Sequence, residues 1–253
     1  MNMRGRIFIA LLALVTAGKA ADFKHDMYVC ANLSGQSQVM GSSRVVTPSG
    51  LLRSIDRQTF SHLGPSHIRL FSVTRDPHDA ATLFIALLDG VLRMRHDGSA
   101  RRTLTDWRMT EPHVIAFDPN APDHLYLGLP DGIGVSRDRG QSWRRANEGI
   151  RRAYTHALTI DRTQAGRVLA GTERGIYLTE DGAATWRLVQ PTTKVTYDIR
   201  QSPAQPAAFL AVTSSEGALW SDDAGRTWRP IAGVPTKHTL HNCDFDRSNA
   251  QRI

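Results

Sequence analysis

The sequence has little of several features that would point to a membrane or a nucleic acid. Its strongly apolar stretch, IFIALLALV at 7–15, is too short to cross a bilayer. Dense runs of lysine and arginine, as found in nucleic-acid-binding segments, are absent although the formal net charge is +7. Cysteine occurs only twice in 253 residues. The short apolar stretch predicts no stable membrane insertion, and the absence of dense basic runs predicts no nucleic-acid partner.

The first twenty residues are typical of a secretory signal peptide. Arg4 and Arg6 precede the apolar stretch, and Gly18-Lys19-Ala20 offers the small residues of a cleavage site. Removal of 1–20 takes away three positive charges and no acids, so the formal charge falls from +7 to +4. We therefore expect a secreted or periplasmic protein in which residues 21–253 form a single domain.

A short pattern recurs at a fixed spacing in the second half of the chain. It reads SRDRGQSW at 136–143, TEDGAATW at 179–186 and SDDAGRTW at 221–228, which places the tryptophans 43 and 42 residues apart. Each copy follows an apolar run, a polar turn, a second apolar run and a glycine. A period near 42 indicates a repeat architecture. With four antiparallel strands in each repeat, it predicts an all-β fold, a β-propeller of four-stranded blades.

Five repeats can be placed along the chain, of which the first two are weaker. In 69–98, Met94 and His96 replace the serine and aspartate of the pattern, and 50–60 is one residue short, with Phe60 in place of tryptophan. The predicted blades are 27–63 together with 238–253, then 69–107, 112–149, 154–190 and 195–235.

The two ends of the chain bear on the number of blades. Residues 27–35 align with the second strand of a repeat, and no first strand precedes them. Residues 240–253 align with the first strand of a repeat. The C-terminal strand could therefore complete the N-terminal blade and close five blades, which would remove the exposed sheet edges. The alternative is a truncated chain from a six- or seven-bladed propeller. Closure would make Cys30 and Cys243 neighbours, either as a disulfide or as two small buried residues.

The recurring pattern resembles the Asp-box, or bacterial neuraminidase repeat, S-x-D-x-G-x-[ST]-W. In that family the box is a structural turn at the outer corner of a propeller blade. The aspartates can accept backbone N–H groups, the glycines can adopt left-handed conformations, and the tryptophans can pack between sheets. Ala183 departs from the pattern, since Gly182 is shifted by one position. The residues with this expected structural role are Ser136, Asp138, Gly140, Trp143, Thr179, Asp181, Trp186, Ser221, Asp223, Gly225 and Trp228.

Propellers with such repeats serve several functions, so the resemblance does not give the function of this chain. They occur in sialidases, xyloglucanase-type glycoside hydrolases, sortilin-like receptors and photosystem II assembly factors. A sialidase would bring an Arg-Ile-Pro motif, which this sequence lacks. Tyr154 and Tyr197 could be nucleophiles, but nothing places an acid beside either. We expect a non-catalytic protein that binds a protein or a glycan without a cofactor. The alternative is a glycoside hydrolase of the sialidase or xyloglucanase type.

The inner strands predict one candidate binding site. An aromatic residue or a histidine stands five positions before the end of the first strand in each blade. In a propeller these residues would ring the mouth of the central channel, where three histidines could bind a metal or a ligand. The opening is wide for a single ion to reach all three, so we expect no metal site. The five residues are Phe71, His113, His156, Tyr197 and His241.

Charged residues in the turns and loops of the same face are further candidates. Asp89, Asp131 and Glu216 each precede a glycine, as acids commonly do in tight hairpins, and Glu173-Arg174 stand at the equivalent turn. Two such carboxylates about 5–10 Å apart could hydrolyse a glycoside. The loops between blades add basic residues that suit an anionic or carbohydrate partner. These residues are Arg151, Arg152 and Lys194.

Overall fold

The computed structural model describes residues 26–32, 49–64, 69–99, 101–151 and 154–246. The expected signal peptide and the end of the expected C-terminal strand, 247–253, lie outside these residues. The chain divides into two compact units, 1–70 and 71–253, and each is described by itself. One turn of 3-10 helix, Trp107–Met109, accompanies the strands. Within the described part of the chain, no helix is long and apolar enough to span a membrane.

The first unit contains an antiparallel sheet of three strands. β1 (Met27–Ala31) pairs with β2 (Gly50–Ser54), which pairs with β3 (Ser61–Leu63). The turn after β2 has the hydrogen bonds of an Asp-box. In this turn the carboxylate of Asp56 accepts the backbone N–H of Thr59 at 2.8 Å and its hydroxyl at 2.6 Å. The weak repeat at 50–60 therefore folds into the same kind of turn as the clear copies.

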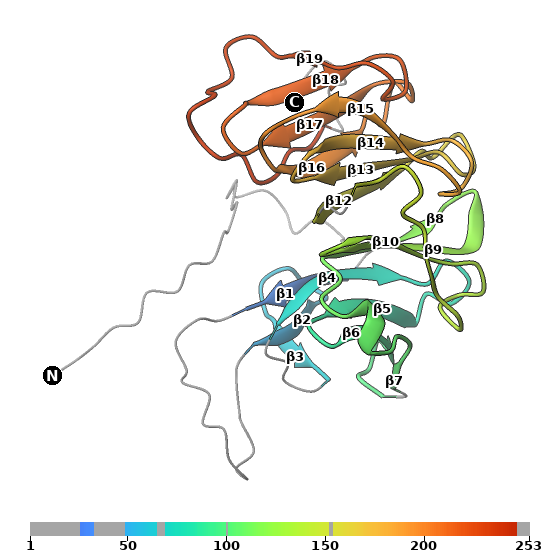
Figure 1. Ribbon diagram of the computed structural model, residues 1–253. Coiled ribbons are helices and arrows are strands. Elements are labelled where there is room, and N and C mark those ends of the chain that lie inside the picture. Colours follow the sequence, from blue (N-terminus) through green and yellow to red (C-terminus); the bar gives the residue numbers. More distant parts are fainter. Residues whose placement is uncertain (1–25, 33–48, 65–68, 100, 152–153, 247–253) are drawn as a thin grey trace, which may run out of the picture. The chain divides into compact units, whose positions relative to one another are not determined.

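The second unit contains four antiparallel sheets of four strands, and in each sheet the strands follow one another in sequence order (Figure 1). Such a succession of four-stranded meanders confirms the predicted fold class, a β-propeller built of antiparallel blades. The sheets are β4 (Leu70–Arg75), β5 (Thr82–Leu87), β6 (Gly90–Arg95) and β7 (Arg102–Thr103); β8 (Val114–Asp118), β9 (Ala121–Leu129), β10 (Gly132–Ser136) and β11 (Arg144–Arg145); β12 (Thr155–Ile160), β13 (Val168–Thr172), β14 (Gly175–Thr179) and β15 (Arg187–Pro191); and β16 (Thr196–Gln201), β17 (Phe209–Thr213), β18 (Ala218–Ser221) and β19 (Arg229–Pro230).

The core of the second unit lies between successive sheets. Trp186 belongs to a buried cluster that includes Tyr126 of the preceding sheet and Tyr177 of its own sheet. Trp143 packs against a cluster to which β5 and β9 contribute, and Trp228 packs against one that includes residues of β13 and β17. Burial of aromatic rings of this size dominates the energetics of a core. Each box tryptophan therefore joins its own blade to the blade before it.

The segment after the last sheet differs from the expected strand. Residues 240–246 form no strand, and their contacts with the sheet are isolated. The backbone N–H of Leu240 donates to the carbonyl of Thr213 at 3.2 Å, and Phe245 is buried in a cluster with Leu210. A strand requires a continuous hydrogen-bond ladder, which these contacts do not provide. Pairing of this segment with the first unit, and with it the number of blades, stays a prediction.

Both cysteines are free thiols in the structure. Burial raises the pKa of the Cys30 thiol to about 11. Burial also raises the pKa of the Cys243 thiol, and the nearby carboxylate of Asp198 adds to that effect. A protonated thiol is a poor nucleophile in disulfide exchange. The two cysteines belong to different units, so a disulfide between them stays a prediction.

Candidate functional site

The five predicted site residues form an unbroken row of rings, which we call the ring row. The ring centroid of Phe71 lies 4.3 Å from that of His113, which lies 5.5 Å from that of His156. The centroid of Tyr197 lies 5.5 Å from that of His156 and 4.9 Å from that of His241. Each ring comes from a different blade or from the C-terminal segment. Residues at the same position of successive repeats therefore lie side by side and form a continuous row of rings.

Two glycines allow the strands that carry these rings to approach closely. A Cβ on Gly128 of β9 would lie 3.0 Å from the backbone oxygen of Thr155, and a Cβ on Gly171 of β13 would lie 2.9 Å from that of Thr196. The two threonines directly precede the ring residues of β12 and β16. A side chain at either glycine would crowd the next inner strand, since the atoms nearby include both the backbone oxygen and the methyl group of that strand's threonine. The glycines therefore help to set the spacing of the ring row.

Tyr154 is a member of the ring row that the register argument missed. Its ring stacks on that of His156, with centroids 4.6 Å apart and planes 22° apart. Its hydroxyl is hydrogen-bonded to Nε2 of His113. Tyr154 lies two residues before His156, and residues two apart in an extended chain point to the same face. That spacing was the signal in the sequence that could have found it.

His156 is uncharged at neutral pH. Burial, and then the nearby imidazole of His113, lower the pKa of His156 to about 4. A neutral imidazole has one nitrogen that donates and one that accepts a hydrogen bond. No group of three or more His, Cys, Asp or Glu within the described ranges is arranged to hold a metal ion. The arrangement therefore suits an organic ligand that stacks on rings and forms hydrogen bonds.

Two of the three turn acids predicted as weak catalytic candidates contact other side chains. Asp131 forms an ion pair with Arg145, and Glu216 accepts a hydrogen bond from the Thr193 hydroxyl at 3.3 Å. Asp89 is exposed in the turn between β5 and β6. The contacts of Asp131 and Glu216 are those of residues that hold a turn or a loop.

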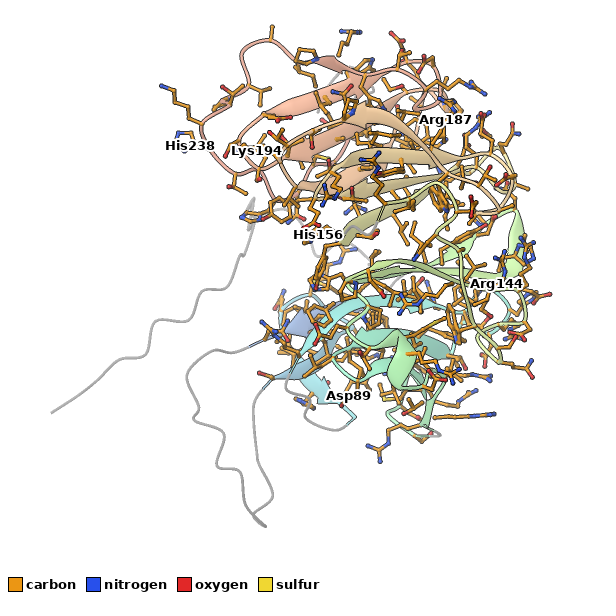
Figure 2. The ribbon with its side chains drawn as sticks, viewed as in Figure 1. Asp89, Arg144, His156, Arg187, Lys194 and His238 are labelled. Atoms are coloured by element: carbon orange, nitrogen blue, oxygen red, sulfur yellow. The ribbon has the colours of Figure 1, made fainter. Side chains whose placement is uncertain are left out.

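Figure 2 separates three of the candidates from two residues of the Asp-box corners. Arg144 and Arg187 directly follow box tryptophans. Asp89, His156 and Lys194 lie to the left of both arginines in this view.

The aspartates of the Asp-boxes accept hydrogen bonds from residues of their own turns. Asp181 accepts the backbone N–H of Thr185 at 2.9 Å, its hydroxyl at 2.6 Å and the hydroxyl of Thr179 at 2.7 Å. Burial acts to raise the pKa of Asp181, but these hydrogen bonds outweigh it and lower the pKa to about 2. Asp138 and Asp223 accept the corresponding bonds in their own boxes. These contacts give the three carboxylates a structural part in the turn.

The second box keeps this turn although alanine replaces glycine. The φ angle is 81° at both Gly140 and Gly225 and 65° at Ala183. A left-handed conformation costs an alanine about 1 kcal/mol. The indole N–H of Trp186 donates to the carbonyl of Ala146 at 2.9 Å, whereas the other two box tryptophans donate to the glycine of their own turn. The second box, with alanine in place of glycine, thus differs in the hydrogen-bond acceptor of its tryptophan but keeps the backbone conformation of the turn.

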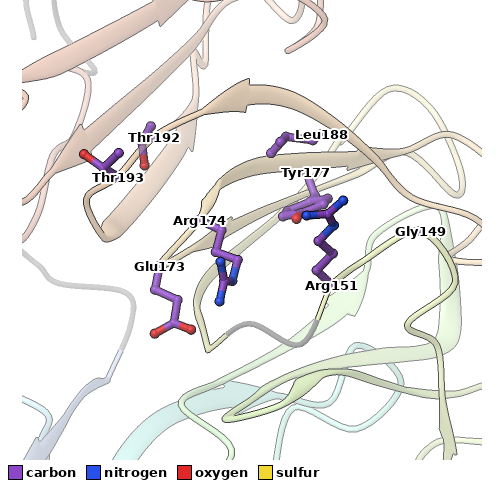
Figure 3. Close-up of a pocket in the computed structure, with 8 residues that line it drawn as sticks. All are labelled: Gly149, Arg151, Glu173, Arg174, Tyr177, Leu188, Thr192 and Thr193. Atoms are coloured by element: carbon purple, nitrogen blue, oxygen red, sulfur yellow. The ribbon is translucent and has the colours of Figure 1, made fainter.

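A pocket of about 750 Å³ opens beside the β13–β14 hairpin (Figure 3). It is lined by Gly149 and Arg151 ahead of β12, by residues of β14, β15 and the hairpin, and by Thr192 and Thr193 after β15. The hairpin is joined to the row because the backbone N–H of Glu173 donates to the carbonyl of Tyr154 at 3.2 Å. Arg151, a predicted binding residue, lines this pocket. Arg152 lies outside the described residues.

Comparisons with known proteins agree with this architecture. The sortilin-Vps10 family model (sortilin, neurotensin receptor 3) matches residues 131–253. Over 146 residues the chain is 26% identical to an oligoxyloglucan-reducing end-specific xyloglucanase from Emericella nidulans, an alignment that covers 49% of this chain and 18% of that enzyme. The chain has the β-propeller fold, with turns that resemble Asp-boxes. This description rests on the repeated boxes, the four-stranded blades and these similarities together.

Two solved structures show the same fold as this chain. The GH74 enzyme of Niastella koreensis has a TM-score of 0.60 at 15% identity, with 71% of this chain and 34% of that chain covered. The structure of YCF48 bound to D1 peptide has a TM-score of 0.53 at 14% identity, with 74% of this chain and 63% of that chain covered. This chain spans less than two thirds of each of these proteins. Its similarity includes both enzymes and a peptide-bound protein, so the fold does not decide the function.

Proposed function

We propose that this propeller is an exported, non-catalytic protein that binds a glycan or a protein through the ring row. The observation that carries the proposal is the contact of each ring with the next from Phe71 to His241, with successive centroids 4.3–5.5 Å apart. Side chains in contact along such a row present one surface to a ligand. Asp131 and Glu216 have partners in Arg145 and Thr193, which favours binding over hydrolysis.

A glycan fits the chemistry of this surface better than a peptide does. Aromatic rings offer flat apolar faces and, in tyrosine and histidine, polar edges. A sugar ring has the same combination, because its C–H groups make an apolar face and its hydroxyl groups make a polar rim. The neutral imidazole of His156 can donate or accept a hydrogen bond to such hydroxyl groups.

The test is binding of the full chain to a glycan array and to proteins from a pull-down, compared with a variant in which four rings become alanine. Loss of the stacked rings is expected to weaken binding at least about tenfold, since buried aromatic anchors dominate binding energies. His241→Ala alone guards against misfolding, because this side chain is exposed. Unchanged binding by the folded variants would contradict the proposal. The four substitutions are His113→Ala, His156→Ala, Tyr197→Ala and His241→Ala.

A glycoside hydrolase is the second candidate, and the similarity to the Emericella nidulans xyloglucanase favours it. Hydrolysis would require two carboxyl groups about 5–10 Å apart across a bound sugar. Cleavage of xyloglucan or an aryl glycoside by the wild type, lost in Asp131→Ala or Asp89→Ala, would support this candidate over binding alone. Absence of cleavage with retained glycan binding would favour the non-catalytic protein.

A further inference from the structure

The pocket beside the β13–β14 hairpin holds two arginines without an acidic partner in the described structure. Arg151 and Arg174 both line it, and neither forms an ion pair with a residue that the structure describes. Glu173 is the single acid among the lining residues, so the pocket has a net positive charge. Figure 3 shows Arg174 between Glu173 and Arg151 in this view. A guanidinium presents a planar set of donors that matches a carboxylate.

The wall of the pocket offers an apolar surface as well as hydrogen-bonding groups. Leu188 is 44% exposed there and is one of the few large apolar side chains that are exposed in the described part of the chain, whereas Tyr177 of the same lining is only 3% exposed. Thr192 and Thr193 add hydroxyl oxygens at the rim. Pockets for small ligands are mostly apolar with a few placed polar groups, at volumes of about 300–1,000 Å³. The combination suits one or two sugar rings that carry a charged group.

The pocket and the ring row are connected through the backbone of the β13–β14 hairpin. The backbone N–H of Glu173 donates to Tyr154, whose ring stacks on His156. On the other side of the hairpin, the backbone N–H of Thr192 donates to the carbonyl of Arg174 at 3.3 Å. A ligand longer than one residue could therefore lie on the rings and extend its charged group between the arginines.

We propose that the pocket is a subsite for the carboxylate of an acidic oligosaccharide, that is, one containing uronic acid residues. The inference rests on the proposed function, since it adds a charge-selective position to glycan binding at the ring row. Arg151 and Arg174 bind the carboxylate of the uronic acid, and Leu188 contacts its ring. Charge-assisted hydrogen bonds to a carboxylate are stronger than neutral ones, so the acidic sugar gains over its neutral counterpart.

The experiment compares matched acidic and neutral sugars on the full chain. The probes are glucuronate- and galacturonate-containing oligosaccharides and the same oligosaccharides after reduction of their carboxyl groups, first on an array and then by isothermal titration calorimetry. The wild type is expected to bind the best acidic probe about tenfold more tightly than its reduced form, a difference of about 1.4 kcal/mol. Raising the salt concentration should reduce this preference.

The variants Arg151→Gln and Arg174→Gln should lower the ratio of the two Kd values toward one. Arg144→Gln, at an exposed position on the outer strand β11, is the matched control and should keep the wild-type ratio. Equal binding of acidic and reduced probes by the wild type would overturn this inference and leave glycan binding at the ring row intact. Binding of neither kind of sugar, or of acidic peptides alone, would overturn both the inference and a glycan as the ligand.

Discussion

The hydroxyl of Tyr154 is hydrogen-bonded to Nε2 of His113, while the Tyr154 ring stacks on His156. One side chain thus connects the rings of two neighbouring blades. His113 in turn stacks on Phe71. Tyr154 therefore contacts two rings in the middle of the ring row.

Tyr154→Phe should weaken the fold and loosen the row without removing the stacking. Loss of the hydroxyl removes a hydrogen bond that contributes about 1 kcal/mol to the free energy of unfolding. Urea denaturation followed by tryptophan fluorescence measures the change. Tyr197→Phe is the control, and it should change the free energy of unfolding by less than about 0.5 kcal/mol. Equal effects of the two substitutions would argue against a specific role for the Tyr154 hydroxyl.

The low pKa of His156 predicts a loss of stability in mild acid. Burial and the nearby His113 lower this pKa from 6.5 to about 4, so the unfolded chain binds a proton more readily than the folded chain. The contribution of neutral His156 is fully present above pH 6.5 and is lost progressively as the pH falls toward 4. Melting temperatures measured between pH 7 and pH 4 should fall less steeply for His156→Gln than for the wild type. Parallel curves for the two proteins would contradict the assignment.

Asp181→Asn should destabilise the corner of its blade. An amide cannot accept all the hydrogen bonds that the carboxylate takes from Thr179, Ala184 and Thr185, so a cost of about 1 kcal/mol is expected. The pKa of Asp181 is lowered to about 2, so its stabilisation is present above about pH 4 and is lost as the pH falls toward 2. Chemical denaturation at pH 7 and pH 3 should therefore show a smaller difference between mutant and wild type at the lower pH. Asp222→Asn, at an exposed position, serves as the control.

Gly149→Ala should be among the more damaging single substitutions in the second unit. Gly149 has a φ of 85°, and a Cβ there would lie 2.0 Å from the carbonyl oxygen of Trp186. Gly233 has a φ of 81° with no atom of the described structure within 4 Å of such a Cβ. Gly233→Ala should thus cost about 1 kcal/mol from its left-handed conformation alone. Gly149→Ala should cost at least about 2 kcal/mol more, because backbone must move. Similar unfolding midpoints for the two variants would contradict the close approach.

Phe245→Ala should detach the C-terminal segment from the last sheet. Phe245 is 4% exposed, and its ring lies 5.9 Å from that of Trp220. Truncation of a buried phenylalanine costs about 3–5 kcal/mol. Urea denaturation measures the loss, and limited proteolysis of the variant should show earlier cleavage near residues 238–246. His238→Ala, at an exposed position of the same segment, should leave both readouts unchanged.

The sequence could predict the blades because one spacing governs several kinds of residue at once. The box tryptophans, the turn glycines and the first-strand ring residues all recur near 42 residues, and each has a role that permits few substitutes. The same regularity gave His113 and His156 equivalent positions, and their ring centroids lie 5.5 Å apart. It did not include Tyr154, because a register argument compares equivalent positions and ignores neighbours two residues away.

The pocket and the C-terminal segment could not be predicted in this way. The pocket is lined by residues of β14, β15 and three loops, and the position of Arg174 relative to Arg151 depends on backbone hydrogen bonds that no repeat specifies. The segment at 240–246 has the sequence pattern of the first strand of a repeat. A strand forms, however, only where a neighbouring strand supplies its hydrogen-bond partners. Local sequence alone does not tell which neighbour is available.

The packing of each box tryptophan against the preceding sheet has an implication for how such a chain can change in length. The indole of Trp186, for example, loses its cluster neighbours Tyr126, Ile133 and Val135 if the repeat before it is cut out. Insertions or deletions should therefore be tolerated when they comprise a whole repeat, which carries its own tryptophan and the receiving surface for the next. A fragment that stops within a repeat would leave an apolar strip open to water and should aggregate.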